Sequence, residues 1–418
     1  MDIQAQMTEL AGAAKQASRD MAKASSQAKD RAIDILAGLL QSEAGMIFEA
    51  NARDLEAAKA SGMDAAKLDR LRLTPKVMDS LIEACRSVAA LPDPVGAVES
   101  MWTRPNGLMV GRMRIPLGVI AMIYESRPNV TVDSAILCLK AGNAVILRGG
   151  AEALHSNQAL AGVLRQALSQ AGLPAEAVQM VPTTDRAAVP ALCKLDQYID
   201  VIIPRGGEGL IRAVVQEATM PVLKHYKGVC HLFVDQGADL GQAVTIVHNA
   251  KCQRPGVCNA LECLLVHREA AKEFLPMVGQ DLAEAGVELR ACPVSLPLLP
   301  KAKPAGPEDW GCEFLDYILA VRVVNDLDQA LDHIAKYSSN HTECILTSDH
   351  GRAMRFLREA DASMVGINCS TRFNDGGELG LGAEIGISTS KLHAYGPMGL
   401  KELTSAKFVV FGQGQVRA

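Results

Sequence analysis

The chain has 418 residues, of which 49% are hydrophobic and 21% charged, a composition typical of a soluble globular protein with two or three domains. A net charge of -5 and only 4% aromatic residues argue against a nucleic-acid partner, which requires a basic face or stacking rings. No run approaches the ~18 apolar residues of a membrane span and no signal-peptide pattern opens the chain, so we expect a cytoplasmic protein that does not bind membranes.

The eleven cysteines are odd in number, scattered along the chain and free of any CxxC pair. Disulfides and a structural zinc site are therefore not expected, and we predict no metal. In a reducing compartment such cysteines persist as thiols.

The N-terminal quarter, from Ile3 to about Ala90, follows a helical pattern. Two strand-like segments come next, 107–116 with polar interruptions and 118–125 as a continuous apolar run suited to a buried strand. Helices are then expected at 131–142, 152–172, 185–195 and 208–218, with strands at 143–148, 177–182 and 198–204.

A second alternating series follows, with helices at 239–250, 269–286, 326–339 and 351–361. Its strands are expected at 262–267, 315–324, 343–349 and 364–369. Alternation of this kind predicts an α/β fold in which helices cover parallel sheets on both faces. The chain ends in a short apolar strand whose edge needs a partner, and pairing with another subunit would provide one.

Two glycine-containing loops follow strands of the first series. In "PRGGEGLIRAV", Gly206 and Gly207 precede a helix whose N-terminal N–H groups could meet a phosphate. In "NAVILRGGAEA", Arg148 and Gly149 end a strand in the same way. A plain tight turn and an exposed arginine explain each loop about equally well, but two such strand ends in one domain favour a nucleotide site.

The loop "YESRPNVTVD" contains Asn129 just beyond the carboxyl end of a buried strand, where α/β folds place their sites. An asparagine that only caps the following helix is the commoner case. The alternative is a side-chain amide that donates to an oxyanion.

The stretch "CQRPGVCNALECLLVH" raises the question of why Cys258 follows a Pro-Gly pair. Most cysteines in a chain with eleven are small buried hydrophobes, and Cys138 and Cys263 lie in apolar periodic segments that fit this role. The turn before Cys258 places it outside regular structure, which makes it the candidate nucleophile. The scattered histidines lack the spacing of a zinc site.

Together these residues resemble the aldehyde dehydrogenase superfamily over nearly the whole chain. The most specific stretch is "VNDLDQALDHIAKYSSNHTECI", Val324–Ile345, and "QRPGVCNALE" and the run from Ser370 are also similar to family sequences. The resemblance is greatest to a branch that reduces L-glutamyl 5-phosphate to glutamate 5-semialdehyde with NADPH, through a cysteine thioester, in proline biosynthesis.

The resemblance implies an aldehyde dehydrogenase-like fold of two doubly wound parallel-sheet domains and a small β oligomerisation flap. It places the cofactor-binding domain at 1–108 and 130–235, the catalytic domain at 236–370, and the flap at 109–129 and 390–418. It further implies a homo-oligomer and, as a candidate partner, the glutamate 5-kinase that makes the labile acyl phosphate.

Carried over to this chain, the resemblance makes Cys258 the nucleophile and Asn129 the oxyanion donor. It assigns Arg148 to the cofactor, where the superfamily has a lysine, and Glu313 to the nicotinamide ribose. Because an acyl phosphate and an amino-acid carboxylate both carry negative charge, arginines in loops near these motifs are candidate substrate ligands, with a structural role as the alternative for each; these are Arg127, Arg254 and Arg372.

Two departures from the wider superfamily bear on the chemistry. His225 stands where oxidative members carry a glutamate base, so hydrolysis of a thioester loses a contribution of ~10² to 10⁴-fold. Ala151 stands where NAD-preferring members place a glutamate on the adenosine ribose, although Glu152 is one residue away. Two alternatives remain: an oxidative NAD(P)-dependent aldehyde dehydrogenase, and a cofactor-binding scaffold without turnover.

Overall fold

The computed structural model describes residues 2–417 and divides the chain into two compact units. The first unit runs to Lys224 and includes residues 380–386 and 398–417. The second comprises His225–Leu379 and Ile387–Pro397. No helix within residues 2–417 has the length and apolar character that crossing a membrane requires.

The predicted helical start of the chain is confirmed. Its helices are α1 Ile3–Met21, α2 Ser26–Ser42, α3 Ala44–Ala60, α4 Ala65–Leu71 and α5 Pro75–Ala90. Ser25 and Thr74 cap α2 and α5 through their hydroxyl oxygens, and Pro75 occupies the first position of α5, where no N–H is needed. On α2 the apolar face buries Ile33, Leu36 and Leu40, as its spacing predicts.

The core sheet of the first unit has four parallel strands in the order β5-β4-β3-β6. They are β3 Val119–Tyr124, β4 Ala144–Arg148, β5 Val178–Met180 and β6 Val201–Arg205. The intervening helices are α6 Asn129–Lys140, α7 Leu154–Gln170 and α8 Ala188–Cys193, and α9 Glu208–Glu217 follows the last strand. Every residue of β3 is buried, as expected for a central strand between two parallel neighbours.

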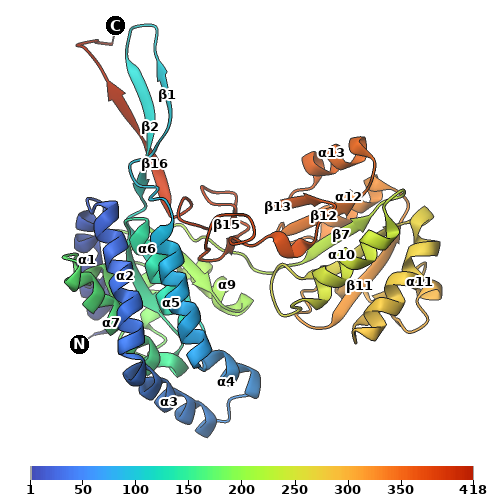
Figure 1. Cartoon of the computed structure of the whole chain (residues 1–418), viewed down its shortest axis with the longest axis horizontal. Helices are drawn as coiled ribbons and strands as arrows, with labels where there is room; N and C mark the ends of the chain where they lie inside the picture. The colour runs from blue at the N-terminus through green and yellow to red at the C-terminus, as the bar shows by residue number, and fades with distance from the viewer. Residues whose placement is uncertain (1, 418) are drawn as a thin grey trace. The chain divides into compact units, whose positions relative to one another are not determined.

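A second sheet of the first unit is an antiparallel ribbon in the order β1-β2-β16, which extends away from the helices of this unit in Figure 1. Its strands are β1 Val98–Thr103, β2 Met109–Pro116 and β16 Thr404–Phe411. The strand β1 was not predicted, and residues 119–124 were expected in the flap. These residues form β3 of the parallel sheet, because their side chains on both faces are apolar and buried.

The second unit is built on seven parallel strands in the order β10-β9-β11-β8-β7-β12-β13. The strands are β7 Cys230–Val234, β8 Leu261–His267, β9 Glu288–Ala291, β10 Lys303–Pro304, β11 Ile318–Val324, β12 Thr342–Leu346 and β13 Met364–Ile367. The helices are α10 Leu240–Cys252, α11 Arg268–Glu284, α12 Leu327–Tyr337 and α13 His350–Glu359. A short pair, β14 Ile387–Ser388 and β15 Gly396–Pro397, also belongs to this unit.

The alternation of side chains along β8 shows how this sheet is covered on both faces. Leu264 and Val266 pack in one apolar cluster with residues of α10 and α11, whereas Cys263 and Leu265 pack in another with residues of α12 and α13. In Figure 1 these helix pairs flank the sheet. The α/β class with parallel sheets is confirmed.

One strand lies in a different sheet from the one the predicted boundaries imply. Residues 230–234, within the segment 130–235 assigned to the cofactor-binding domain, form β7 between β8 and β12 of the second unit. Similarly, residues 390–397, which the prediction placed in the flap, lie in the second unit. No strand was predicted at 230–234, and the place of a segment in the chain carries no information about which sheet it joins, since long-range pairing decides that.

Candidate active site

Cys258 lies in the loop between the end of α10 at Cys252 and the start of β8 at Leu261, and it is half-buried. The thiol of Cys230 donates to the carbonyl oxygen of Cys258 at 3.2 Å. Burial raises the pKa of Cys230 well above its ordinary value, which keeps this donor protonated. The carbonyl group of Cys258 is therefore held by the Cys230 thiol at the start of strand β7.

Gly228 provides a second contact with the nucleophile loop. A Cβ atom built at Gly228 would lie 2.0 Å from the carbonyl oxygen of Cys258, so only glycine fits there. The N–H of Gly228 donates to Glu313 Oε1 at 2.8 Å. Gly228 thus brings Glu313, a predicted cofactor ligand, into the immediate neighbourhood of Cys258.

The residue after the nucleophile anchors the loop. Asn259 is buried, and its side-chain amide donates to the carbonyl oxygen of Asn374 at 2.9 Å. The hydroxyl of Thr371 donates to the carbonyl oxygen of Asn259 at 2.7 Å. These bonds join the Cys258 loop to the segment 370–374, which follows strand β13.

A buried ion pair connects the elements on either side of the loop. Lys251, near the end of α10, lies 2.6 Å from Glu262 on β8, and both side chains are 0% exposed. The other carboxylate oxygen of Glu262 accepts from the N–H of Leu315 at 3.1 Å. Burial raises the pKa of Glu262 to about 7, against the opposing effect of Lys251.

Two of the three predicted substrate arginines lie beside the Cys258 loop. Arg254 is exposed within the loop itself, and the half-buried Arg372 donates to Gln253 Oε1 at 2.7 Å. Burial lowers the pKa of Arg372, Asp375 opposes this shift, and Arg254 and Cys258 also act on it, which places these groups within one electrostatic environment. Cationic side chains at this position suit an anionic substrate.

His225, in the position of the superfamily's glutamate base, has its Nδ1 atom 2.9 Å from the carbonyl oxygen of Ile387. Its ring packs edge-on against His341, with centroids 5.8 Å apart. Burial lowers the pKa of His341 to about 3, so that ring is neutral, and its Nδ1 lies 3.6 Å from the sulfur of Cys230. His225 is thus linked to the Cys258 backbone through two intervening side chains.

A buried cluster of His231, Cys263 and His333 has the composition of a metal site. However, the Arg322 guanidinium donates to His333 Nδ1 at 2.8 Å, and burial lowers the pKa of His333 to about 2. The proton of this neutral ring is therefore on Nε2, which faces the Cys263 sulfur at 3.5 Å. That tautomer directs an N–H at the cluster where a metal would need a lone pair.

Asn129 is the first residue of α6, in the first unit, and it is half-buried. Its side-chain amide donates to Asp133 Oδ2 at 2.9 Å, one turn along the helix. Burial raises the pKa of Asp133 to about 6. The side-chain NH2 group of Asn129 has two hydrogens. The bond to Asp133 uses one of them and thereby fixes the direction of the second N–H.

The loop containing Gly206 and Gly207 ends at the N-terminus of α9, as predicted. The N–H of Gly207 donates to Glu125 Oε2 at 2.9 Å. A Cβ at Gly206 would lie 2.6 Å from the same oxygen, so this glycine allows the carboxylate to approach. The Glu125 carboxylate thus binds the N–H of Gly207, one of the N–H groups that the sequence predicted would bind a phosphate.

Arg148 ends β4 and donates through Nη1 to the carbonyl oxygen of Gly149 at 2.8 Å. Its Nε is buried without a hydrogen-bond partner among the described residues 2–417. A Cβ at Gly149 would lie 2.1 Å from the side-chain nitrogen of Asn157, so tight packing against α7 explains this glycine. Arg127 is exposed in the loop before α6.

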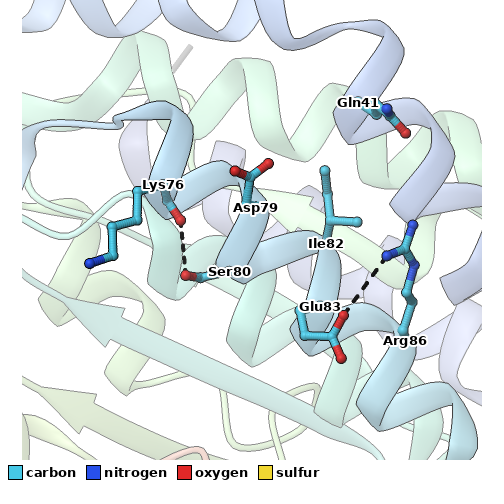
Figure 2. Close-up of a pocket in the computed structure, with 7 residues that line it drawn as sticks. All are labelled: Gln41, Lys76, Asp79, Ser80, Ile82, Glu83 and Arg86. Atoms are coloured by element: carbon cyan, nitrogen blue, oxygen red, sulfur yellow. Dashed lines mark hydrogen bonds and ion pairs between the residues drawn. The ribbon is translucent and has the colours of Figure 1, made fainter.

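A surface pocket between α2 and α5 is the one drawn in Figure 2. Its lining includes two acids, Asp79 and Glu83, and two bases, Lys76 and Arg86, and Arg86 lies 3.8 Å from Glu83. The charges cancel, and none of the predicted site residues lines this pocket. It is therefore not the candidate active site.

The predicted residues separate into two groups. Cys258, Glu313, Arg254 and Arg372 lie in the second unit, where the contacts of Gly228 and Arg372 bring them together. Those in the first unit, all at or just beyond the carboxyl ends of β3, β4 and β6, are Arg127, Asn129, Arg148, Gly149, Gly206 and Gly207. Sequence reasoning missed Gly228, Asn259 and Glu125, which act through contacts with distant segments.

Two parallel-sheet α/β units with an antiparallel ribbon define the aldehyde dehydrogenase fold. Comparison with known proteins agrees, since the model of the aldehyde dehydrogenase family matches residues 3–290. The gamma-glutamyl phosphate reductases of Solidesulfovibrio magneticus and Nitratidesulfovibrio vulgaris are 70% and 68% identical to this chain, each over 100% of both chains. The crystal structure of the gamma-glutamyl phosphate reductase of Thermotoga maritima is 47% identical, covers 99% of this chain and 100% of its own, and superposes with a TM-score of 0.97. The chain therefore belongs to the aldehyde dehydrogenase family and, within it, to the gamma-glutamyl phosphate reductases.

Proposed function

We propose that the chain reduces L-glutamyl 5-phosphate to L-glutamate 5-semialdehyde and phosphate in proline biosynthesis, with NADPH as the reductant and Cys258 as the nucleophile. The observation that carries the proposal is the set of groups around Cys258, where a half-buried thiol lies in a rigidly anchored loop with Arg254, Arg372 and Glu313 nearby. The names of the relatives support the same reaction.

In the first step the Cys258 sulfur attacks the acyl carbon, a C–S bond forms, and the C–O bond to phosphate breaks with its electron pair leaving on the phosphate. Arg254 and Arg372 stabilise the departing dianion. Since phosphate is a good leaving group, the few per cent of thiolate present in an ordinary cysteine at neutral pH is sufficient.

The bound nicotinamide cofactor supplies a hydride. The Asn129 amide stabilises negative charge on the carbonyl oxygen of the thioester as it is reduced. When the oxyanion collapses, the C–S bond breaks, the aldehyde leaves, and Cys258 recovers its thiolate. His225, whose Nδ1 lies beside a carbonyl oxygen, replaces the glutamate that would activate water, so hydrolysis of the thioester is disfavoured.

The preference for NADPH rests on charge. Arg148 offers a guanidinium whose Nε is buried without a hydrogen-bond partner among residues 2–417, and Ala151 leaves no carboxylate at the position that would repel a 2′-phosphate. An arginine pairs with a phosphate through two parallel N–H bonds. We expect Arg148→Ala to raise the KM for NADPH more than the KM for NADH.

The decisive experiment replaces Cys258 with alanine and measures reduction of the acyl phosphate, together with phosphate-dependent oxidation of glutamate 5-semialdehyde. We expect both rates to fall by at least about 10³-fold, while circular dichroism and NADPH binding are retained. Cys252→Ala, at the last residue of α10 before the loop, is the matched control and should retain activity. Normal turnover in Cys258→Ala would exclude the mechanism, and oxidation without phosphate would indicate an aldehyde dehydrogenase that produces acid.

We also propose that the ribbon pairs with a second copy of the chain. Its exposed apolar side chains include Trp102, which is 39% exposed, Phe408 at 63% and Val410 at 57%. Light scattering should give a multiple of 44.5 kDa. Phe408→Asp should lower that mass, whereas Val416→Asp, at an exposed position beyond the strand, should not.

A further inference from the structure

The loop after β3 is tied to the loops of both neighbouring strands in the four-stranded sheet. On one side the Glu125 carboxylate accepts from the N–H of Gly207, beyond β6, at 2.9 Å. On the other, the N–H of Ser126 donates to Glu152 Oε1, beyond β4, at 2.8 Å, and the Ser126 hydroxyl donates to the same oxygen. Asn129 follows three residues after Ser126.

Ser126 adopts a backbone conformation that a serine does not favour. Its φ of +29° lies in the left-handed region, which residues other than glycine rarely adopt. Such a conformation persists only where the surrounding structure holds it. Two hydrogen bonds to one carboxylate oxygen are such a restraint. Glu152 therefore stabilises a turn that the sequence alone disfavours.

The position of the Glu152 carboxylate is itself built into the fold. The side chain folds back over Gly150, where a built Cβ would lie 2.2 Å from Oε1 of Glu152. Gly150 is thus required for the carboxylate to reach Ser126. Although Glu152 is one residue from Ala151, its Oε1 is engaged by the protein and not directed to open space.

We propose that Glu152 is a positioning residue, which holds the Ser126 turn and thereby sets the direction in which the Asn129 amide points. This inference rests on the proposed function, in which Asn129 stabilises the oxyanion. Asp133 restrains the Asn129 side chain from within α6, and the Glu152–Ser126 link restrains the start of α6 through the backbone. A small error in the placement of a donor reduces the rate without weakening ground-state binding.

The experiment compares Glu152→Ala, Glu152→Gln and the control Glu176→Ala, which removes an exposed carboxylate from the same unit. We expect Glu152→Ala to lower kcat by about 10- to 100-fold while the Kd for NADPH, from its fluorescence, changes less than twofold. Glu152→Gln keeps an oxygen that accepts from Ser126, so its kcat should stay within about threefold of the parent. A raised NADPH Kd with unchanged kcat would make Glu152 a cofactor ligand and overturn the proposal.

Hydrogen exchange provides a readout that does not depend on activity. In Glu152→Ala, the amides of residues 125–127 and 129 should exchange faster than in the parent and in Glu176→Ala. Unchanged exchange would overturn the inference, whereas faster exchange in a protein whose parent lacks reductase activity would contradict the proposed function alone. If Glu152→Ala does not fold, Ser126→Ala, which removes only the hydroxyl bond, should give a smaller kcat loss in the same direction, and no loss of kcat would overturn the proposal.

Discussion

The loop containing Cys258 and the loop that precedes Asn129 are held in place by different kinds of interaction. The Cys258 loop is secured by the buried amide of Asn259 and by a fully buried ion pair between its flanking elements. The loop before Asn129 is secured by carboxylates of Glu125 and Glu152 that accept backbone N–H bonds. The first loop is thus held by buried groups of its own unit, and the second by carboxylates that reach between neighbouring strand ends.

The largest effect is expected from breaking the buried pair beside the Cys258 loop. Lys251→Met leaves Glu262 buried without its cation and should cost about 3–5 kcal/mol in urea unfolding at pH 8. Because an unpaired Glu262 can take up a proton, the loss should shrink at pH 5.5. Lys251→Met combined with Glu262→Leu should recover most of the stability.

The matched control for that prediction is an exposed pair in the same unit. Lys303 lies 2.6 Å from Glu288 but is 67% exposed, so Lys303→Met should change the unfolding free energy by no more than about 1 kcal/mol. Equal losses from Lys251→Met and Lys303→Met would show that burial of the Lys251 pair does not support the loop.

For the loop that precedes Asn129, the largest effect is expected from Asn129→Ala. It should lower kcat by about 10² to 10³-fold, corresponding to about 2.7–4 kcal/mol of transition-state stabilisation. The KM should change little, because the amide acts on charge that develops during the reaction. Asp133→Asn keeps an oxygen that can accept from Asn129 and should retain kcat within about threefold. A KM effect without a kcat effect would assign Asn129 to substrate binding instead.

A smaller loss is expected from the amide that anchors the nucleophile loop. Asn259→Ala leaves the carbonyl of Asn374 without its donor and should reduce the free energy of unfolding by about 1–3 kcal/mol. Asn106→Ala, at an exposed position in the ribbon turn, should have less than half that effect. If activity falls while stability does not, Asn259 acts on the geometry of Cys258 alone.

The smallest expected effect is the change in unfolding free energy with pH that arises from His341, which lies near the Cys258 loop. Burial lowers the pKa of His341 to about 3, whereas the unfolded residue titrates near 6.5. Between these values the unfolded chain binds the proton and the folded chain does not, so stability falls as pH falls from about 6.5 toward 3. The slope from one such group is at most about 1.4 kcal/mol per pH unit. Urea unfolding at pH 7, 6 and 5 should show it, and His341→Gln should flatten it.

Most helices and strands could be predicted because their signals are local. The apolar spacing of α2 and the continuous apolar run of β3 each specify an element without reference to the rest of the chain. β1 was missed because all six of its residues are exposed, so no burial pattern marks it. β7 was not predicted as a strand, and its residues were assigned to the wrong domain because the strands with which they pair are distant in sequence.

The candidate site was predictable to a similar extent. Cys258 and Asn129 stand at positions that chain order alone makes prominent, one after a Pro-Gly turn and the other after a buried strand. Gly228 was not predictable, because nothing near it in the sequence indicates contact with Cys258. The expectation of a phosphate at Gly207 could not anticipate Glu125, which comes from a neighbouring strand's loop.

The sequence by itself determined the alternating α/β pattern, the family and the candidate catalytic and binding residues. Periodicity, turn residues and short motifs are properties of neighbouring positions, so they can be read without the fold. Only the tertiary structure decided how those residues are held: the glycine beneath Cys258, the ion pair beside it, and the carboxylate that stabilises Ser126 in a disfavoured conformation. Each of these is a contact between separate elements, even where the partners are as near in sequence as Lys251 and Glu262, and such contacts exist only once the chain has folded into its sheets.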